Sequence, residues 1–283
     1  MDKPQFTVVV PVYNGQDTIV PLFAEMEAVF TGMNETFTVV FVCDGARDSS
    51  WEIIESLHKQ HPSIVKGVRL TRNFGQHNAI ICGFEFAEGN YIITMDEDLQ
   101  HNPRDIPSLF EEMKSRGLDV IYGKARKSKH NSFRNITSGI IRIIAAWAIP
   151  GLHRDYSAYR VLRSNIAYNV IEMRNSYTFL DGYLAWITEK VGSKEVDHRK
   201  RYSGESSYSI ARLLAHAINI FVTFSNMPIK MLTAMSLLSF ATSSMYAAII
   251  FIRKILYNDL VPGYAALAIM VGAGVGMILL GLG

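Results

Sequence analysis

Five short apolar segments, rich in β-branched residues, alternate with stretches of helical spacing, and this pattern constrains the fold more than any other feature of the chain. The segments are Phe6 to Val12, Phe37 to Cys43, Ile64 to Leu70, Tyr91 to Met95 and Leu118 to Tyr122. Between the first two, residues 18–30 place their apolar side chains on one stripe, and Ser49 with Glu52 forms a capping-box signature for the next helix. The alternation predicts an α/β fold with a mostly parallel, Rossmann-like sheet covered by helices on both faces.

Polar residues follow four of these predicted strands, at the point where each strand ends. The stretches are PVYNG, CDGARDSS, LTRNFGQH and MDEDLQ. The carboxyl ends of parallel strands meet at one edge of a sheet, where such folds bind ligands. We therefore expect the four stretches to form one site.

The acidic stretch after the fourth strand predicts a metal site. Asp96 and Asp98 are two positions apart, and carboxylates held close together repel each other unless a cation lies between them. No histidine or cysteine cluster accompanies them, so Mg²⁺ or Mn²⁺ is expected rather than zinc. As a bare motif, D-x-D usually marks a solvated loop, but the end of a strand is the expected place for a site.

A metal at this edge favours a nucleotide diphosphate ligand, because such ions are commonly bound by one or two carboxylates plus substrate phosphates. The first loop, with Pro11, Tyr13 and Asn14, supplies a turn and an aromatic face. Asp44 supplies an acceptor for a base or ribose, and we add Arg72 from LTRNFGQH to the donor-binding set.

The last quarter of the chain differs in character from the rest. Ile229 to Ile252 is almost uncharged, and Pro262 to Gly283 is a second apolar stretch, each long enough to cross a bilayer. We expect two transmembrane helices in residues 228–283, a cytosolic catalytic domain in residues 1–227, and an integral protein of the bacterial inner membrane or an equivalent membrane. Because the sequence stops inside an apolar run, we also expect the natural chain to continue.

Two mixed stretches, near residues 133–149 and 209–222, carry arginines and aromatic residues among aliphatic ones. Each is typical either of a helix lying in the membrane interface or of an amphipathic helix packed on the sheet. Just before the first stretch, five cations occur within eleven residues without an acid, as a surface patch or as a dock for an anionic lipid headgroup: Lys124, Arg126, Lys127, Lys129 and Arg134. The net charge of +2 argues against nucleic-acid binding.

Together these motifs resemble the family 2 glycosyltransferases of GT-A fold, and within them the polyprenyl-phosphate glycosyltransferases, such as dolichol-phosphate mannosyltransferases and the bacterial enzymes that load undecaprenyl phosphate. The matching stretches are VVVPVYNG, VCDGARDSS, LTRNFGQHNAIICGF, MDEDLQHNP, DVIYGKAR, DYSAYRVL and RYSGESSYS. The resemblance covers about residues 8–228. It implies membrane anchoring, a metal cofactor and a homo-oligomer.

The resemblance also implies roles for individual residues on the donor side. Asp44 would contact the base, Asp96 the ribose or diphosphate, and Asp98 with Gln100 the metal, while Arg201 in RYSGESSYS would clamp the diphosphate from a mobile loop. The chain departs from the family at Ala46, where serine is usual, and at Gly15, where an acidic residue is usual. These departures concern the base and ribose contacts.

On the acceptor side, the resemblance assigns the lipid phosphate to Arg126, Arg134 and Ser138, although Gly-Lys-Ala-Arg replaces the usual Gly-Ser-Arg before the first of these. Asp155 matches the residue often assigned as catalytic base. A phosphate monoester is already largely ionised at neutral pH, since its second pKa is about 6. We therefore expect Asp155 to orient the acceptor and to stabilise the oxocarbenium-like sugar as much as to take a proton.

The sequence thus predicts an inverting, metal-dependent transferase that moves a sugar from a nucleotide diphosphate, with a UDP-sugar favoured over a GDP-sugar, to polyprenyl phosphate at the cytosolic membrane face. One alternative is a processive polysaccharide synthase, but no Q-x-x-R-W motif is present. Another is a non-catalytic nucleotide-binding membrane subunit, which the acidic pair and the basic clamp disfavour.

Overall fold

The structure is a computed structural model, which describes residues 3–126, 149–173, 178–197, 199, 219, 222–223 and 227–257, with positions 263, 267, 269–271, 274, 277–278 and 281. The chain separates into two compact units, Met1–Leu214 and Ala215–Gly283. The domain boundary predicted between residues 227 and 228 stays a prediction.

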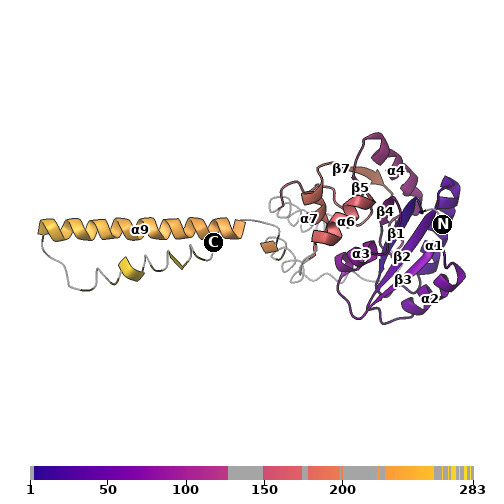
Figure 1. Cartoon of the computed structure of the whole chain (residues 1–283), viewed down its shortest axis with the longest axis horizontal. Helices are drawn as coiled ribbons and strands as arrows, with labels where there is room; N and C mark the ends of the chain where they lie inside the picture. Colours follow the sequence, from indigo (N-terminus) through magenta and orange to yellow (C-terminus); the bar gives the residue numbers. More distant parts are fainter. Residues whose placement is uncertain are drawn as a thin grey trace. The chain divides into compact units, whose positions relative to one another are not determined.

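The first unit contains a seven-stranded mixed sheet in the order β3-β2-β1-β4-β6-β5-β7 (Figure 1). Its strands are β1 (Phe6–Val12), β2 (Phe37–Asp44), β3 (Val65–Leu70), β4 (Tyr91–Thr94), β5 (Val120–Ala125), β6 (Arg160–Arg163) and β7 (Val191–Val196). Its helices are α1 (Ile19–Met33), α2 (Ser50–Gln60), α3 (Gln76–Phe84), the 3₁₀ helix η1 (Pro103–Asp105), α4 (Ile106–Ser115), α6 (Ser164–Met173) and α7 (Leu180–Ile187).

The predicted strands are all present, and their alternation with helices is confirmed. The sheet is mostly parallel, but β6 runs antiparallel to both β4 and β5. The sequence analysis did not identify β6 or β7, because β6 has only four residues and β7, VGSKEV, is not an apolar run.

The capping box predicted at Ser49 is wrong, since its side chain makes no capping bond. Instead, Asp48 accepts the backbone N–H of Ser50 at 3.1 Å.

Helices cover both faces of the sheet, as the pattern predicts. On one face, Phe6, Val8 and Val10 of β1 belong to a fully buried core shared with α1, α2 and α4. On the opposite face α3 approaches so closely that a Cβ added at Gly83 would lie 2.4 Å from Cγ1 of Val9. Glycine at this position therefore sets the distance between α3 and the sheet.

The second unit is described mainly through one helix, α9 (Met227–Tyr257), of 31 residues. Its segment Ile229–Arg253 has a mean hydropathy of 1.7, with 6% of the most apolar window buried by protein. By length and composition this helix can cross a membrane. The second predicted span, residues 262–283, lies mostly outside the described residues and stays a prediction, as do both predicted interfacial helices.

We predict that Gly83→Ala destabilises the first unit by about 1–3 kcal/mol, because the added methyl group overpacks the contact between α3 and β1. Thermal unfolding of the full chain in detergent measures this. Gly32→Ala is the matched control, since its Cβ meets nothing within 4 Å on α1. The control should be neutral or stabilising by up to about 1 kcal/mol. Equal midpoints for both variants would contradict the close packing at Gly83.

Candidate active site

The sheet topology brings every predicted site stretch within the described residues to one edge. The parallel strands β1, β2, β3 and β4 all end there, and β5 and β7 run in the same direction. Because β6 is antiparallel, it begins where the others end, with Arg160 opposite Thr94. The segment before β6, which includes Asp155, therefore reaches the same edge as the acidic loop, which we define as residues 96–102.

Hydrogen bonds between loops hold the nucleotide side of this edge together. Asn14 adopts a left-handed conformation with φ 56°, and its Oδ1 accepts the backbone N–H of Arg47 at 2.9 Å. The N–H of Gly15 donates to Oγ of Ser50 at 2.9 Å. Asn14 thus serves first to fix the loops after β1 and β2 to each other.

Asp44 holds the loop that follows β3. Its two carboxylate oxygens accept the backbone N–H groups of Phe74 and Gly75, at 2.7 and 2.9 Å, and its side chain is buried. Gly75 has φ 90°, a conformation that glycine adopts without strain. This structural role was not foreseen, and the predicted contact between Asp44 and a base stays a prediction.

A cavity of about 460 Å³ opens beside this loop. It is lined by Tyr13, Gly45, Ala46, Arg47, Arg69, Leu70, Thr71, Arg72 and Asn73. Tyr13 is 43% exposed, so its ring is accessible to a ligand. Of the predicted donor-binding residues, Tyr13 and Arg72 therefore line the cavity, whereas Pro11 is buried within β1 and does not.

The acidic loop follows β4 and carries the predicted metal ligands. Asp98 Oδ1 accepts the N–H of Gln100 at 3.1 Å, which closes a tight turn. The side-chain amide of Gln76, from the start of α3, donates to Asp96 Oδ1. Two carboxylates and one amide thus lie in a single loop, and within the described residues no group of three or more His, Cys, Asp or Glu side chains forms a metal site.

Glu97 lies between the two aspartates and turns back toward the first loop. Its Oε1 accepts the N–H of Tyr13 at 3.3 Å. Burial, together with the negative charges of Asp96 and Asp98, raises the pKa of Glu97 to about 7, although backbone hydrogen bonds lower it. A Cβ at Gly15 would lie 2.9 Å from Cγ of Glu97, so Glu97 occupies the space that a side chain at position 15 would need.

The acidic loop contains a backbone conformation that is unusual for its residue type. Leu99 has φ 61°, a left-handed conformation that costs a non-glycine residue roughly 1–3 kcal/mol. The imidazole of His101 is buried, stacks on Tyr159 at 5.1 Å, and accepts the N–H of Asp96 through Nδ1 at 3.1 Å. The hydroxyl of Tyr159 donates to the Asn102 carbonyl at 2.9 Å. These contacts hold the loop in its strained form.

Asp155 lies among polar partners from two neighbouring strands. Nζ of Lys124 on β5 is 2.9 Å from its Oδ1, and Oγ of Ser193 on β7 donates to its Oδ2 at 3.1 Å. Burial acts to raise the pKa of Asp155, but the hydrogen bonds from Lys124 and Ser193 outweigh it, so the pKa is lower than usual. A carboxylate held ionised in this way is a weak proton acceptor.

Arg126 has acidic neighbours that its local sequence does not reveal. Its guanidinium is 3.7 Å from Glu195 and 3.8 Å from Asp197, although its side chain is 74% exposed. The cation stretch contains no acid of its own, but β5 pairs with β7, which brings Glu195 and the following Asp197 near Arg126. Arg134, Ser138 and Arg201 lie outside the described residues, so their predicted roles stay predictions.

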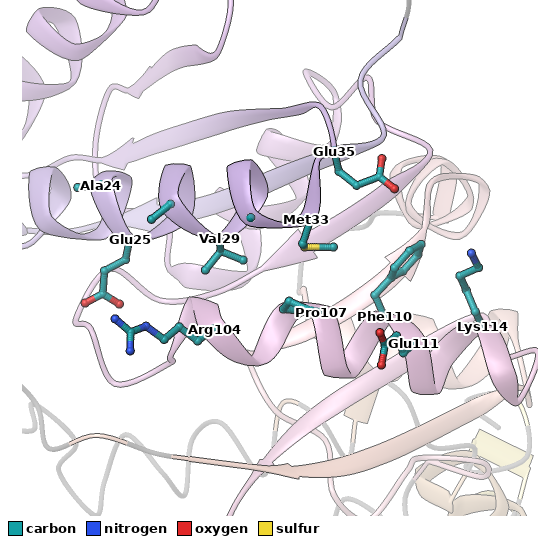
Figure 2. A pocket seen from close by; sticks show the side chains of 12 residues that line it. Ala24, Glu25, Val29, Met33, Glu35, Arg104, Pro107, Phe110, Glu111 and Lys114 are labelled. Carbon is teal, nitrogen blue, oxygen red and sulfur yellow. The ribbon is translucent and has the colours of Figure 1, made fainter.

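A larger cavity, of about 880 Å³, lies in a groove between α1 and α4 (Figure 2). Its floor is apolar, with Val29, Met33 and Phe110, and charged side chains such as Glu25 and Lys114 surround it. None of the predicted site residues lines this groove, so cavity size does not identify the site here.

Sequence reasoning missed Gln76, Lys124 and Ser193 as partners of predicted site residues. Gln76 lies inside RNFGQH and Lys124 inside the cation cluster, so both stretches were noticed without these pairings. Ser193 had no signal, since it lies in β7, a strand that the apolar pattern did not reveal. Its place beside Asp155 follows only from the pairing of β5 with β7.

With this geometry described, comparison with known proteins identifies the class. Residues 7–176 match the model of glycosyl transferase family 2, so the chain belongs to that family. A glucosyl-3-phosphoglycerate synthase from Mycobacterium tuberculosis, crystallised with Mn²⁺, UDP-glucose and phosphoglyceric acid, superposes with a TM-score of 0.56 at 15% identity, covering 78% of each chain. At that identity the similarity establishes the GT-A-like fold alone.

The relatives found by sequence have a higher sequence identity to this chain than the solved structure above. The chain is 27% identical to the uncharacterized glycosyltransferase YkcC of Bacillus subtilis, over 99% of this chain and 86% of that one. It is 30% identical to an undecaprenyl-phosphate 4-deoxy-4-formamido-L-arabinose transferase of Pseudomonas savastanoi, over 89% of this chain and 75% of that one. The resemblance to polyprenyl-phosphate glycosyltransferases drawn from the motifs is thus confirmed.

We predict that Glu97→Gln gains stability relative to the wild type as the pH rises. The raised pKa means that the folded state disfavours ionised Glu97, so the wild type loses stability as the pH rises from about 4.5 through 7. With chelator present, the free energy of unfolding of the variant relative to the wild type should increase by at most about 3 kcal/mol between pH 5 and pH 8. Thermal unfolding measures it, with Glu111→Gln, exposed on α4, as control. A pH-independent difference would contradict this environment for Glu97.

Proposed function

We propose that this protein is an inverting glycosyltransferase that moves a sugar from a nucleotide diphosphate, with a UDP-sugar favoured, to polyprenyl phosphate at the cytosolic face of a membrane. The observation that carries the proposal is the meeting of two sites at one sheet edge: the acidic loop with the cavity beside Tyr13, and the group around Asp155. The names of the relatives support the acceptor class.

The acidic loop fits a divalent cation by the chemistry of its donors. Asp96, Asp98 and Gln100 offer carboxylate and amide oxygens, the ligands that Mg²⁺ and Mn²⁺ prefer. These three side chains would leave coordination positions of the ion for diphosphate oxygens and water. When bound, the ion supplies positive charge that stabilises the diphosphate leaving group.

The reaction that these residues favour is a single in-line displacement. An oxygen of the lipid phosphate forms a bond to the anomeric carbon, and the bond from that carbon to the diphosphate breaks, with its electron pair leaving on the nucleotide diphosphate. Arg201 is proposed to neutralise the departing diphosphate and to exclude water, which would otherwise hydrolyse the donor. The tyrosine ring of Tyr13 is proposed to stack on the nucleotide base.

Asp155 is proposed to position the acceptor side rather than to act as a strong base. Its lowered pKa and its contact with Lys124 keep it ionised. A fixed negative charge beside the reacting centre stabilises positive charge that develops on the sugar. Because the lipid phosphate is already largely ionised at neutral pH, the reaction needs little help from a base.

Membrane anchoring is proposed to bring the lipid acceptor to the site. Helix α9 exposes large apolar side chains along its length, among them Leu238, Phe251 and Ile255. A helix with such a surface is stable in hydrocarbon, where its backbone groups are satisfied internally. Arg126, Arg134 and Ser138 are proposed to hold the lipid phosphate, in a homo-oligomer whose second span and interfacial helices complete the anchor.

We predict that Asp98→Ala abolishes sugar transfer while the protein stays folded, because the loop loses a carboxylate needed to hold the cation and the diphosphate. The assay incubates the purified protein with labelled sugar nucleotides and polyprenyl phosphate, extracts lipid, and follows transfer with and without chelator. Full activity of the variant, or of the wild type in excess chelator, would refute the metal-held diphosphate. A polymeric product, or no glycolipid from any donor, would instead favour the alternatives set out above.

We predict that Asp155→Asn lowers kcat by about 10–1,000-fold, since it removes a fixed charge from the reacting centre. The low-pH limb of the rate profile should remain near pH 6 in the variant, because it reports ionisation of the lipid phosphate. Rates measured from pH 5 to 8 test this. Loss of that limb in the variant would make Asp155 a true base. Thr188→Val serves as a control. It removes a hydroxyl that donates to Asp119 over 2.7 Å, and this hydrogen bond lies outside the site.

A further inference from the structure

The acidic loop is held from outside by Arg199, a residue to which neither the sequence motifs nor the family comparison gave a role. Arg199 lies three positions after β7 and 97 or more positions from its partners in the loop and in α1. Its backbone N–H donates to the carbonyl of Gln100 at 3.0 Å. The N–H of the same Gln100 donates to Asp98 Oδ1. A single residue, Gln100, thus links Arg199 to the carboxylate proposed to hold the cation.

The guanidinium of Arg199 joins the loop to the core. Nη1 donates to both carboxylate oxygens of Glu25 on α1, at 2.8 and 2.9 Å, and Nη2 donates to Oδ1 of Asn102 at 2.8 Å. About two-thirds of each of the Arg199 and Glu25 side chains is buried. Glu25 lies on α1, a helix whose apolar stripe is packed on the sheet (Figure 2). Its ion pair therefore ties Arg199 to an element of the core.

The strain at Leu99 makes such a support necessary. A left-handed, non-glycine residue persists only where its surroundings over-determine the backbone. His101 and Tyr159 hold the loop from the side of β4 and β6, and Arg199 holds the turn at Gln100 from the side of β7. An ordinary exposed ion pair contributes little. Arg199, by contrast, is tied to Glu25 by two charge-assisted bonds, and it holds the turn through a third such bond to Asn102 and its backbone bond to Gln100.

We propose that Arg199, anchored by Glu25, is a positioning residue that holds Asp98 and Gln100 in the geometry that binds the cation and the diphosphate. The proposal rests on the proposed function for the identity of the ligand. It does not make Arg199 a catalytic residue, because its guanidinium contacts α1 and Asn102 rather than a substrate. Partners of this kind, one step removed from metal ligands, typically contribute 10–100-fold to metal affinity or activity.

The test compares Arg199→Ala and Glu25→Gln with the wild type, in the full chain in detergent. The matched control is Glu88→Gln, which removes the charge from an ion pair with Lys66 at 2.6 Å, away from the acidic loop. The first readout is the affinity for UDP in the presence of Mn²⁺, by calorimetry. We expect it to weaken by about 10–100-fold in Arg199→Ala and by about tenfold in Glu25→Gln, with no change in the control.

The second readout needs no ligand. Amide hydrogen exchange over residues 96–102 should be faster in both variants than in the wild type, while exchange in the core strands stays the same. The double variant should bind UDP and exchange amide hydrogens as Arg199→Ala alone does, because both substitutions remove the same support. Glu25→Gln keeps the shape of the side chain and decides the question even if Arg199→Ala does not fold.

Two outcomes would overturn the inference: folded variants with unchanged UDP affinity, or variants with unchanged exchange over residues 96–102. The failure of the proposed function would look different. If the wild type binds UDP with Mn²⁺ but forms no glycolipid, the proposed lipid acceptor is contradicted and the role of Arg199 is unaffected. A wild type that does not bind UDP would remove the proposed donor site, while the exchange measurement would still decide whether Arg199 holds the loop.

Discussion

Repulsion among neighbouring carboxylates is the constraint on which the site depends. Asp96, Glu97 and Asp98 follow one another shortly after β4, and burial together with the charges of the two aspartates raises the pKa of Glu97. A chain can keep such a cluster at a strand end only if rigid contacts hold it there. Gln76 on α3, Tyr159 before β6 and Arg199 after β7 supply those contacts from three different parts of the fold. The concentration of negative charge is then available for a ligand that carries a cation.

The reversed strand β6 accounts for how the proposed donor site and the proposed acceptor site share one edge. In a purely parallel sheet, the segment before a strand lies at the opposite edge from the loops that follow the strands. Because β6 is antiparallel, the segment containing Asp155 arrives beside the acidic loop. The pairing of β5 with β7 then supplies Lys124 and Ser193 as its partners. In the proposed function, the antiparallel strand is therefore what brings the two substrates together.

Charged side chains differ between the proposed donor site and the proposed acceptor site. The cavity beside Tyr13 carries three arginine side chains, Arg47, Arg69 and Arg72, which favour an anionic or carbonyl-rich ligand. At the proposed acceptor site, Lys124 and Arg126 each have acids nearby that offset part of their positive charge. This arrangement fits the small net charge of the chain, which excludes a general attraction to polyanions.

The sequence by itself determined the five apolar strands, their alternation with helices, the long apolar helix α9 and the acidic pair at a strand end, because these features depend on local periodicity and composition. Only the tertiary structure decided which distant residues meet. The antiparallel entry of β6, the acids beside Arg126, the backbone partners of Asp44 and the bridge from Arg199 to Glu25 all depend on strand pairing and on the packing of α1. Such contacts join residues dozens of positions apart, and no local pattern encodes them, since their energy exists only when the whole sheet is formed.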